Sequence, residues 1–391
     1  MAANSRSALI VGAGIGGLAA AVALQREGWN VRVFERAAHA GELGFALLLA
    51  SNAMASLQRL ELEQPVIAGG ASPDAGEIRG SGGRLMRRIH LGQIRHLLAH
   101  QPVVVLRPVL HGVLLAAAGP ENVALGSGAT GFQLRDRTAA LQLADGRTVE
   151  SDVLVGADGV GSVIRKRLHP GEPPPRRSGL WAVRGVAHEI EPHLAEIDGA
   201  QYFGRGVEDG VARAAPRSVY WYLSVPGRQL GGTSEPAAIA RRCAADFDDR
   251  FQRIVAATAP NEMRLDELLD RDPISDWGRG PVTLLGDAAH PMLPHAGQGA
   301  AQALEDAVAL GRVLREEVDI GVALRRYERV RAMRTRRIVL LARRNARLGS
   351  ITNPVLRWLR DAAIRTVPAS VLHKTYIEFG RPPDVEEGPV I

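Results

Sequence analysis

The sequence V-G-A-G-I-G-G-L at residues 11–18 follows the pattern G-x-G-x-x-G and decides the fold of the first part of the chain. An apolar run, 7–11, leads into it and predicts a buried strand. The stretch 18–26 has helical periodicity, and Gly28 is suited to end that helix because glycine tolerates left-handed geometry. Residues 31–34 then predict a second strand. Strand, turn, helix and strand in this order are the opening of a doubly wound parallel sheet.

The three motif glycines suit the binding of a pyrophosphate at the start of a helix. Gly12 permits a tight turn, Gly14 lets the backbone approach the phosphates, and Gly17 lets helix and strand pack closely. Glu35 ends the second strand, 18 residues after Gly17 (35 − 17), where an acid accepts hydrogen bonds from an adenosine ribose. The pattern alone leaves FAD and NAD open, and Glu35 disfavours a phosphorylated ribose. The other expected cofactor contacts of this region are Ile15, Gly16 and Arg36.

A second segment, G-A-D-G-V-G-S-V-I-R at 156–165, follows a predicted strand over 152–156. Asp158-Gly159 predicts a tight turn, and Ser162 and Arg165 are expected on the first turns of a helix. Taken alone, the segment is equally compatible with an ordinary strand–turn–helix unit.

A third segment, G-D-A-A-H-P-M-L-P-H-A-G-Q-G at 286–299, follows a predicted strand over 282–285. Asp287 can accept hydrogen bonds from polyol hydroxyls, and prolines stiffen the loop behind it. Gly297, Gly299 and Ala300 open a long helix, whose free N–H groups and positive dipole favour an electron-rich carbonyl or an anion.

Composition excludes several classes of protein. With 391 residues and 46% hydrophobic residues the chain can form two or three domains with ample cores. One cysteine, Cys243, excludes an internal disulfide and a redox-active cysteine pair. The sequence has no apolar stretch long enough for a membrane span and no signal region, so a cytoplasmic location is expected. The net charge of +6 comes mainly from arginine, and without a basic stripe or zinc spacing we expect neither nucleic-acid binding nor a metal site.

Composition changes near the middle of the chain. The proline-rich stretch 170–177 predicts a linker, and the alternating, aromatic-rich stretch 179–232 predicts an antiparallel sheet. Residues 236–270 are expected to be helical, as is most of the chain beyond 300, with breaks at Pro354 and Pro368. Asn52 is expected to cap a helix over 53–60, and residues 103–106 and 109–118 predict a short strand and a helix.

Together the three segments resemble the class A flavoprotein monooxygenases, the para-hydroxybenzoate hydroxylase-like family of FAD-dependent aromatic hydroxylases. Arg107, in V-L-R-P-V-L-H, matches the family arginine that contacts FAD, and Arg184-Gly185 resembles the R-G strand of the substrate domain. The resemblance implies an α/β fold: a glutathione-reductase-like, doubly wound FAD-binding domain with an inserted antiparallel-sheet substrate domain and a C-terminal helical segment. The implied FAD-binding domain is 1–75, 100–172 and 280–325, the substrate domain 76–99 and 173–279, and the helical region 326–391.

The resemblance further implies noncovalent FAD, with Asp158, Gly286, Asp287, Gly299 and Ala300 among its contacts, and NADH or NADPH as a transient reductant. The implied reaction inserts one atom of O2 into an electron-rich substrate through a C4a-hydroperoxyflavin. A halogenase or a prenyl-chain reductase on the same scaffold is the alternative, although the halogenase signature W-x-W-x-I-P is missing from the sequence. A non-catalytic protein that only binds oxidised flavin is a third hypothesis.

The substrate pocket is expected to be mostly apolar and to take an aromatic or polycyclic molecule. Its expected lining is Phe45, Leu47, Trp181, Arg184, Tyr220, Tyr222 and Pro294, with Leu48 also near the ring. The stretch 41–52 is more hydrophobic than the loop of small residues that is usual at this place in the family. No acid–base triad is recognisable, and the candidates at the flavin edge are Pro294, His295 and Arg184.

Two further features are expected to be structural. His290 and His295 more plausibly make hydrogen bonds within their loop than transfer protons. Region 325–374 holds fourteen arginines and lysines against two acids, which favours a solvated helical surface over contact with an anionic membrane.

Overall fold

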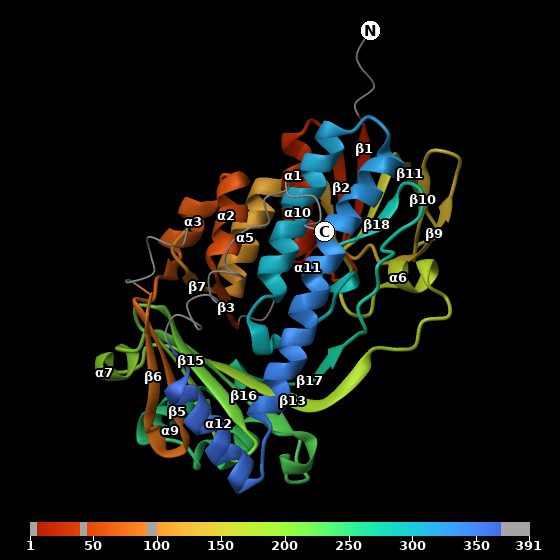
Figure 1. Cartoon of the computed structure of the whole chain (residues 1–391). Coiled ribbons are helices and arrows are strands. Elements are labelled where there is room, and N and C mark those ends of the chain that lie inside the picture. Colours follow the sequence, from red (N-terminus) through yellow and green to blue (C-terminus); the bar gives the residue numbers. More distant parts are fainter. Residues whose placement is uncertain (1–5, 40–44, 92–99, 369–391) are drawn as a thin grey trace.

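The computed structural model describes residues 6–39, 45–91 and 100–368, and its architecture is mixed α/β, as the sequence predicted (Figure 1). A five-stranded sheet is parallel throughout, in the order β18-β12-β1-β2-β8. Its strands come from widely separated parts of the sequence: β1 (Ser7–Val11), β2 (Asn30–Phe34), β8 (Val123–Ala124), β12 (Val153–Gly156) and β18 (Val282–Leu284). The chain therefore returns after the predicted linker to add β18, the strand before the third motif, to a sheet whose other strands precede that linker.

Helices cover this sheet and form the largest hydrophobic core with it. The helix at residues 15–26 contacts two other helices, those at 107–118 and 299–316. The alanines at its buried positions allow this close approach. The helices of this part are α1 (Ile15–Arg26), α2 (Ser51–Arg59), α3 (Glu63–Ala68), α5 (Arg107–Ala118), α6 (Val163–Leu168) and α10 (Gly299–Glu316). Two small antiparallel sheets lie beside it: β3 (Ala46–Leu49) with β7 (Val103–Leu106) and β4 (Gly70–Ala71), and β9 (Ala129–Leu134) with β10 (Ala139–Leu143) and β11 (Thr148–Ser151).

The second large sheet has seven strands, in the order β17-β13-β16-β15-β14-β5-β6. They are β5 (Ala75–Gly80), β6 (Leu85–His90), β13 (Arg176–Ala187), β14 (Gly199–Phe203), β15 (Glu208–Ala215), β16 (Ser218–Pro226) and β17 (Met263–Asp270). One face packs on α8 (Pro236–Ala244) and α9 (Asp249–Ala257) around the aromatic side chains of a second core, with the short α7 (Pro192–Ala195) at its edge. The other face is turned toward the parallel sheet.

Two long helical elements complete the described chain. Helix α11 (Ile320–Gly349) packs on α10 and runs past both large sheets, and α12 (Pro354–Thr366) lies against β6 (Figure 1). Pro354 occupies the first turn of α12, where its missing N–H costs nothing.

Three expectations about local structure need correction. Residues 263–270 form β17, because Pro260 ends the helical run and the strand pairs with β13. Asn52 is not a cap: α2 starts one residue earlier, and the Asn52 side chain is buried against α10. The predicted antiparallel sheet is mixed, since β14 and β5 are parallel. The domain boundaries themselves remain a prediction.

Candidate functional site

A cavity of about 840 Å³ lies between the carboxyl edge of the parallel sheet and the inner face of the seven-stranded sheet. All three sequence motifs open into it, together with the start of α5 and the strands β13 and β16. The predicted residues that line it are Gly12, Gly14, Ile15, Gly16, Glu35, Arg36, Leu47, Leu48, Arg107, Asp158, Arg184, Tyr220, Tyr222, Gly286, Asp287, Pro294, His295, Gly297, Gly299 and Ala300.

The glycine turn after β1 has the geometry that the motif predicts. Gly12 has a φ of +102°, which permits the tight turn, and a Cβ on it would lie 2.4 Å from the Ala157 carbonyl oxygen. A Cβ on Gly17 would lie 1.9 Å from the Gly12 carbonyl oxygen, so only glycine allows this close packing. Gly17 therefore supports the turn from behind and does not line the cavity.

Glu35 has a role in the turn that the sequence did not reveal. Its carboxylate accepts hydrogen bonds from the backbone N–H of Ala13 at 2.8 Å and of Ala37 at 2.9 Å. The acid thus ties the end of β2 to the glycine turn while it also faces the cavity.

The second motif forms a tight turn capped by its own aspartate. Gly159 has a φ of +78°, and Asp158 accepts hydrogen bonds from the Ser162 hydroxyl at 2.5 Å and the Val163 N–H at 2.6 Å. Burial raises the pKa of Asp158, against the effect of these hydrogen bonds. Arg165, almost fully buried, donates to the Ala289 carbonyl at 2.7 Å and so joins the second motif to the third.

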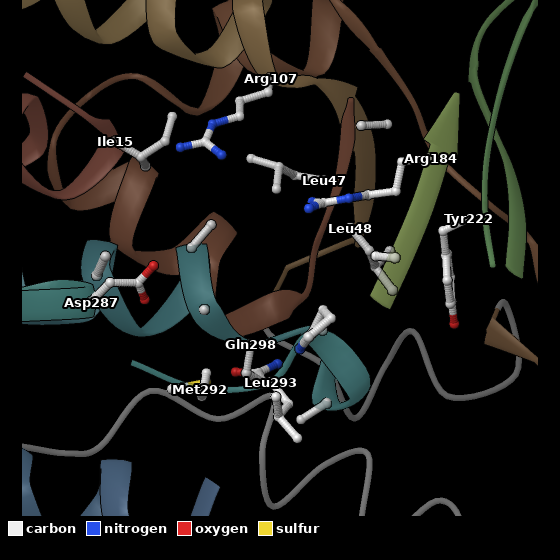
Figure 2. A pocket seen from close by; sticks show the side chains of 18 of the residues that line it. Ile15, Leu47, Leu48, Arg107, Arg184, Tyr222, Asp287, Met292, Leu293 and Gln298 are labelled. Atoms are coloured by element: carbon white, nitrogen blue, oxygen red, sulfur yellow. The ribbon is translucent and has the colours of Figure 1, made fainter. Parts of the chain in front are cut away.

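The third motif turns sharply at its first residue. Gly286 has a φ of +61°, and its N–H donates to Asp306 at 2.9 Å. The Asp287 side chain is exposed and reaches into the cavity on the side of Ile15 and Arg107 (Figure 2). Arg107 begins α5, and its N–H donates to the Phe45 carbonyl at 2.7 Å.

A buried ion network holds the third motif from behind. Arg331 on α11 is fully buried and binds Glu305 and Asp306 on α10, with 2.6 Å between its Nε and Asp306. Burial disfavours ionisation of Asp306, but the charges of His290 and Arg331 hold its pKa at about 2. Asp306 also contacts His290 Nε2 at 2.6 Å, so the hydrogen bond of His290 joins its loop to α10 and is not made within the loop, as the sequence had suggested. Glu305 accepts from Asn52 at 2.6 Å, which extends the network to α2.

The loop before α10 brings its last residues to the cavity. Gly297 is left-handed, with a φ of +61°, and a Cβ on Gly297 or Gly299 would meet nothing within 4 Å. His295 contacts the Ser224 hydroxyl through Nε2 at 2.9 Å, and burial lowers the pKa of His295 to about 4. The neutral ring therefore links the loop to the inner face of β16.

The substrate-side wall differs from the expected one at two positions. Trp181 and Phe45 do not line the cavity. Successive residues of a strand point to opposite faces, so Trp181 cannot share a face with Arg184, three residues further along β13. Phe45 lies behind Arg184 and Tyr220, with 4.9 Å from its ring centre to the guanidinium carbon and 6.4 Å between the two ring centres.

Arg184 is already paired within the wall. Its guanidinium donates to Asp266 on β17 at 2.8 Å while it stacks on Phe45. In Figure 2 Arg184, Leu48 and Tyr222 lie across the cavity from Asp287. This wall thus offers a compensated charge, aliphatic side chains and aromatic rings.

Sequence reasoning missed a polar group behind Tyr222. The Tyr222 hydroxyl donates to Glu208 at 3.3 Å, and Gln201 donates to the same oxygen at 2.8 Å. Glu208 is 2% exposed, and burial raises its pKa to about 7. A Cβ on Gly210 would lie 2.1 Å from the Tyr222 ring, so this glycine makes room for it. The only available signal was the pair of acids Glu208-Asp209 directly before a glycine and an otherwise mainly apolar stretch.

Within residues 6–39, 45–91 and 100–368, no three His, Cys, Asp or Glu side chains are grouped so as to hold a metal ion. None of the helices described is both long and apolar enough to cross a bilayer.

Known proteins resemble the chain over most of its length. A family model described as an FAD binding domain matches residues 6–342. Aurachin C monooxygenase/isomerase of Stigmatella aurantiaca is 33% identical over 360 residues, which cover 91% of this chain and 93% of the relative. The 6-hydroxynicotinate 3-monooxygenase of Bordetella bronchiseptica is 32% identical, over 88% of this chain and 92% of the relative.

The fold agrees with these sequence matches. The crystal structure of Klebsiella pneumoniae HpxO complexed with FAD and uric acid has a TM-score of 0.89 and 27% identity, and the match covers 96% of both chains. A family match over most of the chain, relatives above 30% identity and a cavity lined by all three motifs lead to one conclusion. The chain belongs to the FAD-dependent aromatic hydroxylases, the class A flavoprotein monooxygenases, and is an enzyme of that kind.

Proposed function

We propose that the protein is an NAD(P)H-consuming monooxygenase that inserts one oxygen atom from O2 into an electron-rich aromatic, largely apolar substrate. The single observation that carries the proposal is the shared cavity. It is lined by the glycine turn, Asp158, Asp287 and Gly299 on one side and by apolar and aromatic side chains on the other.

The first side of the cavity suits FAD. The turn at Gly12 and Gly14 and the start of α1 would take the pyrophosphate, and Glu35 the adenosine ribose. Asp287 would accept from the ribityl hydroxyls, with Arg107 nearby. The backbone at three glycines supports this fit: a Cβ on Gly159, Gly297 or Gly299 would meet nothing within 4 Å, so a ligand can approach there. The remaining proposed contacts line the same cavity: Ile15, Gly16, Arg36, Asp158, Gly286 and Ala300.

The protein groups bind, orient and shield, because the flavin, once reduced by NADH or NADPH, supplies the oxygen chemistry itself. The N-terminus of α10, at Gly299 and Ala300, would face the flavin pyrimidine and favour its anionic reduced form. His295 is neutral around pH 7 because burial lowers its pKa to about 4, so we assign it hydrogen bonding and not acid catalysis. Pro294 would lie at the flavin edge.

The wall around Arg184 favours a neutral substrate over a benzoate. The Arg184 guanidinium already donates to the Asp266 carboxylate at 2.8 Å. A substrate carboxylate would therefore have to compete with Asp266 for this guanidinium. Leu47, Leu48 and Tyr220 supply apolar and aromatic surface beside it.

The test compares neutral hydroxylated aromatics and heteroaromatics with hydroxybenzoates, scoring product formed per NAD(P)H consumed. We expect coupled turnover with neutral compounds and mostly peroxide with benzoates. Asp266→Asn should improve use of benzoates by freeing Arg184, whereas Arg264→Gln, which changes the other partner of Asp266, should not. Well-coupled turnover of a small benzoate by the wild type, abolished by Arg184→Ala, would show that the substrate is an anion.

The relatives support oxygenation over halogenation or prenyl-chain reduction, since those cited are named as monooxygenases. Chloride or bromide incorporation into any compound that the enzyme turns over would reverse this preference.

A further inference from the structure

Helix α12 is folded with its polar side inward. Arg360 is 7% exposed, its guanidinium carbon lies 4.8 Å from the centre of the Phe203 ring, and it donates to the Leu348 carbonyl at 3.2 Å. The outward side carries four large apolar side chains, which we name the α12 ridge: Val355 at 63% exposure, Leu356 at 52%, Trp358 at 63% and Leu359 at 49%. A helix that only shielded the protein from water would carry the opposite pattern.

Exposed cations lie on the last turns of α11, the helix that leads into α12. Arg344 and Arg347 are exposed there, next to Leu348, and α12 folds back from the end of α11 (Figure 1). Exposed Arg336 and Arg337 continue the row, and none of the four is paired with a carboxylate among the described residues. Between 329 and 368 the only acid is Asp361, which pairs with Arg360.

The charge pattern decides which partner fits. In a contact with a second copy, a symmetric interface would bring these arginines together without acids to compensate them. An anionic bilayer instead satisfies both parts of the surface, because apolar side chains enter the acyl boundary and arginines meet the lipid phosphates.

We propose that the α12 ridge and the arginines at the end of α11 bind the surface of a bilayer that contains anionic phospholipid. The contact is peripheral and reversible, and its affinity comes from apolar burial and charge together. This proposal is independent of the substrate and of the cofactor chemistry. It replaces the solvated surface that the sequence favoured, because the sequence did not show which side of α12 faces outward.

The test measures binding of the full FAD-loaded chain to vesicles of phosphatidylcholine, with and without phosphatidylglycerol, by co-sedimentation. Trp358 provides a second signal because it is the most exposed of the five tryptophans. We expect binding to the anionic vesicles alone, a blue shift of tryptophan emission that Trp358→Phe removes, and release at raised salt.

Variants separate the two contributions. Trp358→Ser with Leu359→Ser should abolish binding to anionic vesicles, and Arg344→Gln with Arg347→Gln should weaken it by roughly tenfold or more. Leu134→Ser and Arg137→Glu change an exposed apolar residue and an exposed arginine at the distant β9–β10 hairpin and should leave binding unchanged.

Three outcomes would overturn the proposal. They are a lack of binding to anionic vesicles, equal loss of binding in the hairpin variants, and a concentration-dependent dimer that Trp358→Ser dissociates. If the chain does not bind anionic vesicles and the emission of Trp358 is blue-shifted even without vesicles, another part of the protein covers the α12 ridge.

Discussion

At the scale of single residues, the acidic side chains of the motifs both line the cavity and hold their own turns by hydrogen bonds, whereas the sequence suggested only the first role. Glu35 faces the cavity and also accepts backbone hydrogen bonds from Ala13 in the glycine turn and from Ala37, two residues further along the chain. Asp158 faces the cavity and also accepts hydrogen bonds from Val163, the first residue of α6, and from its N-cap Ser162. The residues proposed to bind the cofactor thus also hold their own loops in shape.

Asp287→Ala should weaken FAD binding without unfolding the chain. The side chain is exposed in the cavity, and a hydrogen bond to a charged group contributes about 1.5–3 kcal/mol, or roughly 10- to 150-fold in Kd. Fluorescence titration of the apoprotein with FAD measures the change, with Asp145→Ala on an exposed hairpin as the control. Unchanged FAD affinity in Asp287→Ala would remove Asp287 from the flavin site.

Glu208→Gln should make the protein more stable than the wild type above neutral pH. Burial raises the pKa of Glu208 from 4.5 to about 7, so the folded protein holds this proton more tightly than the unfolded chain does. The contribution of this proton to the free energy of unfolding is fully present below pH 4.5 and is lost as the pH rises through about 7. Each unit by which the pKa is raised corresponds to about 1.4 kcal/mol of that contribution. The amide variant has no proton to lose, so its advantage in urea unfolding should be small in acid and grow over this range. A pH-independent difference would show that Glu208 ionises normally.

At the scale of elements, the sequence predicted the parts built from local patterns. The strands and helices around the three motifs follow from hydrophobic period and glycine turns, and they appear as expected. The strand at 263–270 was not predicted, because it depends on pairing with β13 and not on local sequence. The facing of Trp181 is different: it follows from the alternation of side chains along β13, which the spacing of Trp181 and Arg184 already contains. The Arg331 network was missed for the same reason: its members are distant in sequence and meet only when α10 packs on α11.

Arg331→Met should destabilise the fold strongly, because it leaves Glu305 and Asp306 buried without their main cation. Breaking a buried ion network by removing one partner costs about 3–5 kcal/mol. Arg329→Met, an exposed position on the same helix, should change stability by less than about 0.5 kcal/mol. Chemical denaturation of both variants gives the comparison. Equal stability of the two would mean that the network carries no net energy.

At the scale of the whole molecule, the cavity is closed by surfaces that come from both large sheets. The parallel sheet presents backbone turns and carboxylates, and the seven-stranded sheet presents rings, aliphatic chains and a neutralised arginine. The first side suits a polar dinucleotide and the second an apolar ring. An FAD-dependent hydroxylase has to bind both, the cofactor and an aromatic substrate, in one cavity.

In the reaction that we propose, this enzyme transfers an oxygen atom from O2 to an aromatic substrate in that cavity. The most direct measurement incubates the FAD-loaded protein with NAD(P)H, isotopically labelled O2 and a panel of neutral hydroxylated aromatics, and analyses the products by mass spectrometry. We predict a product that carries one labelled oxygen atom, with yield reduced in Asp287→Ala. If reduced nucleotide is consumed while all the O2 becomes peroxide with every compound, or if the new oxygen comes from water, the account is contradicted.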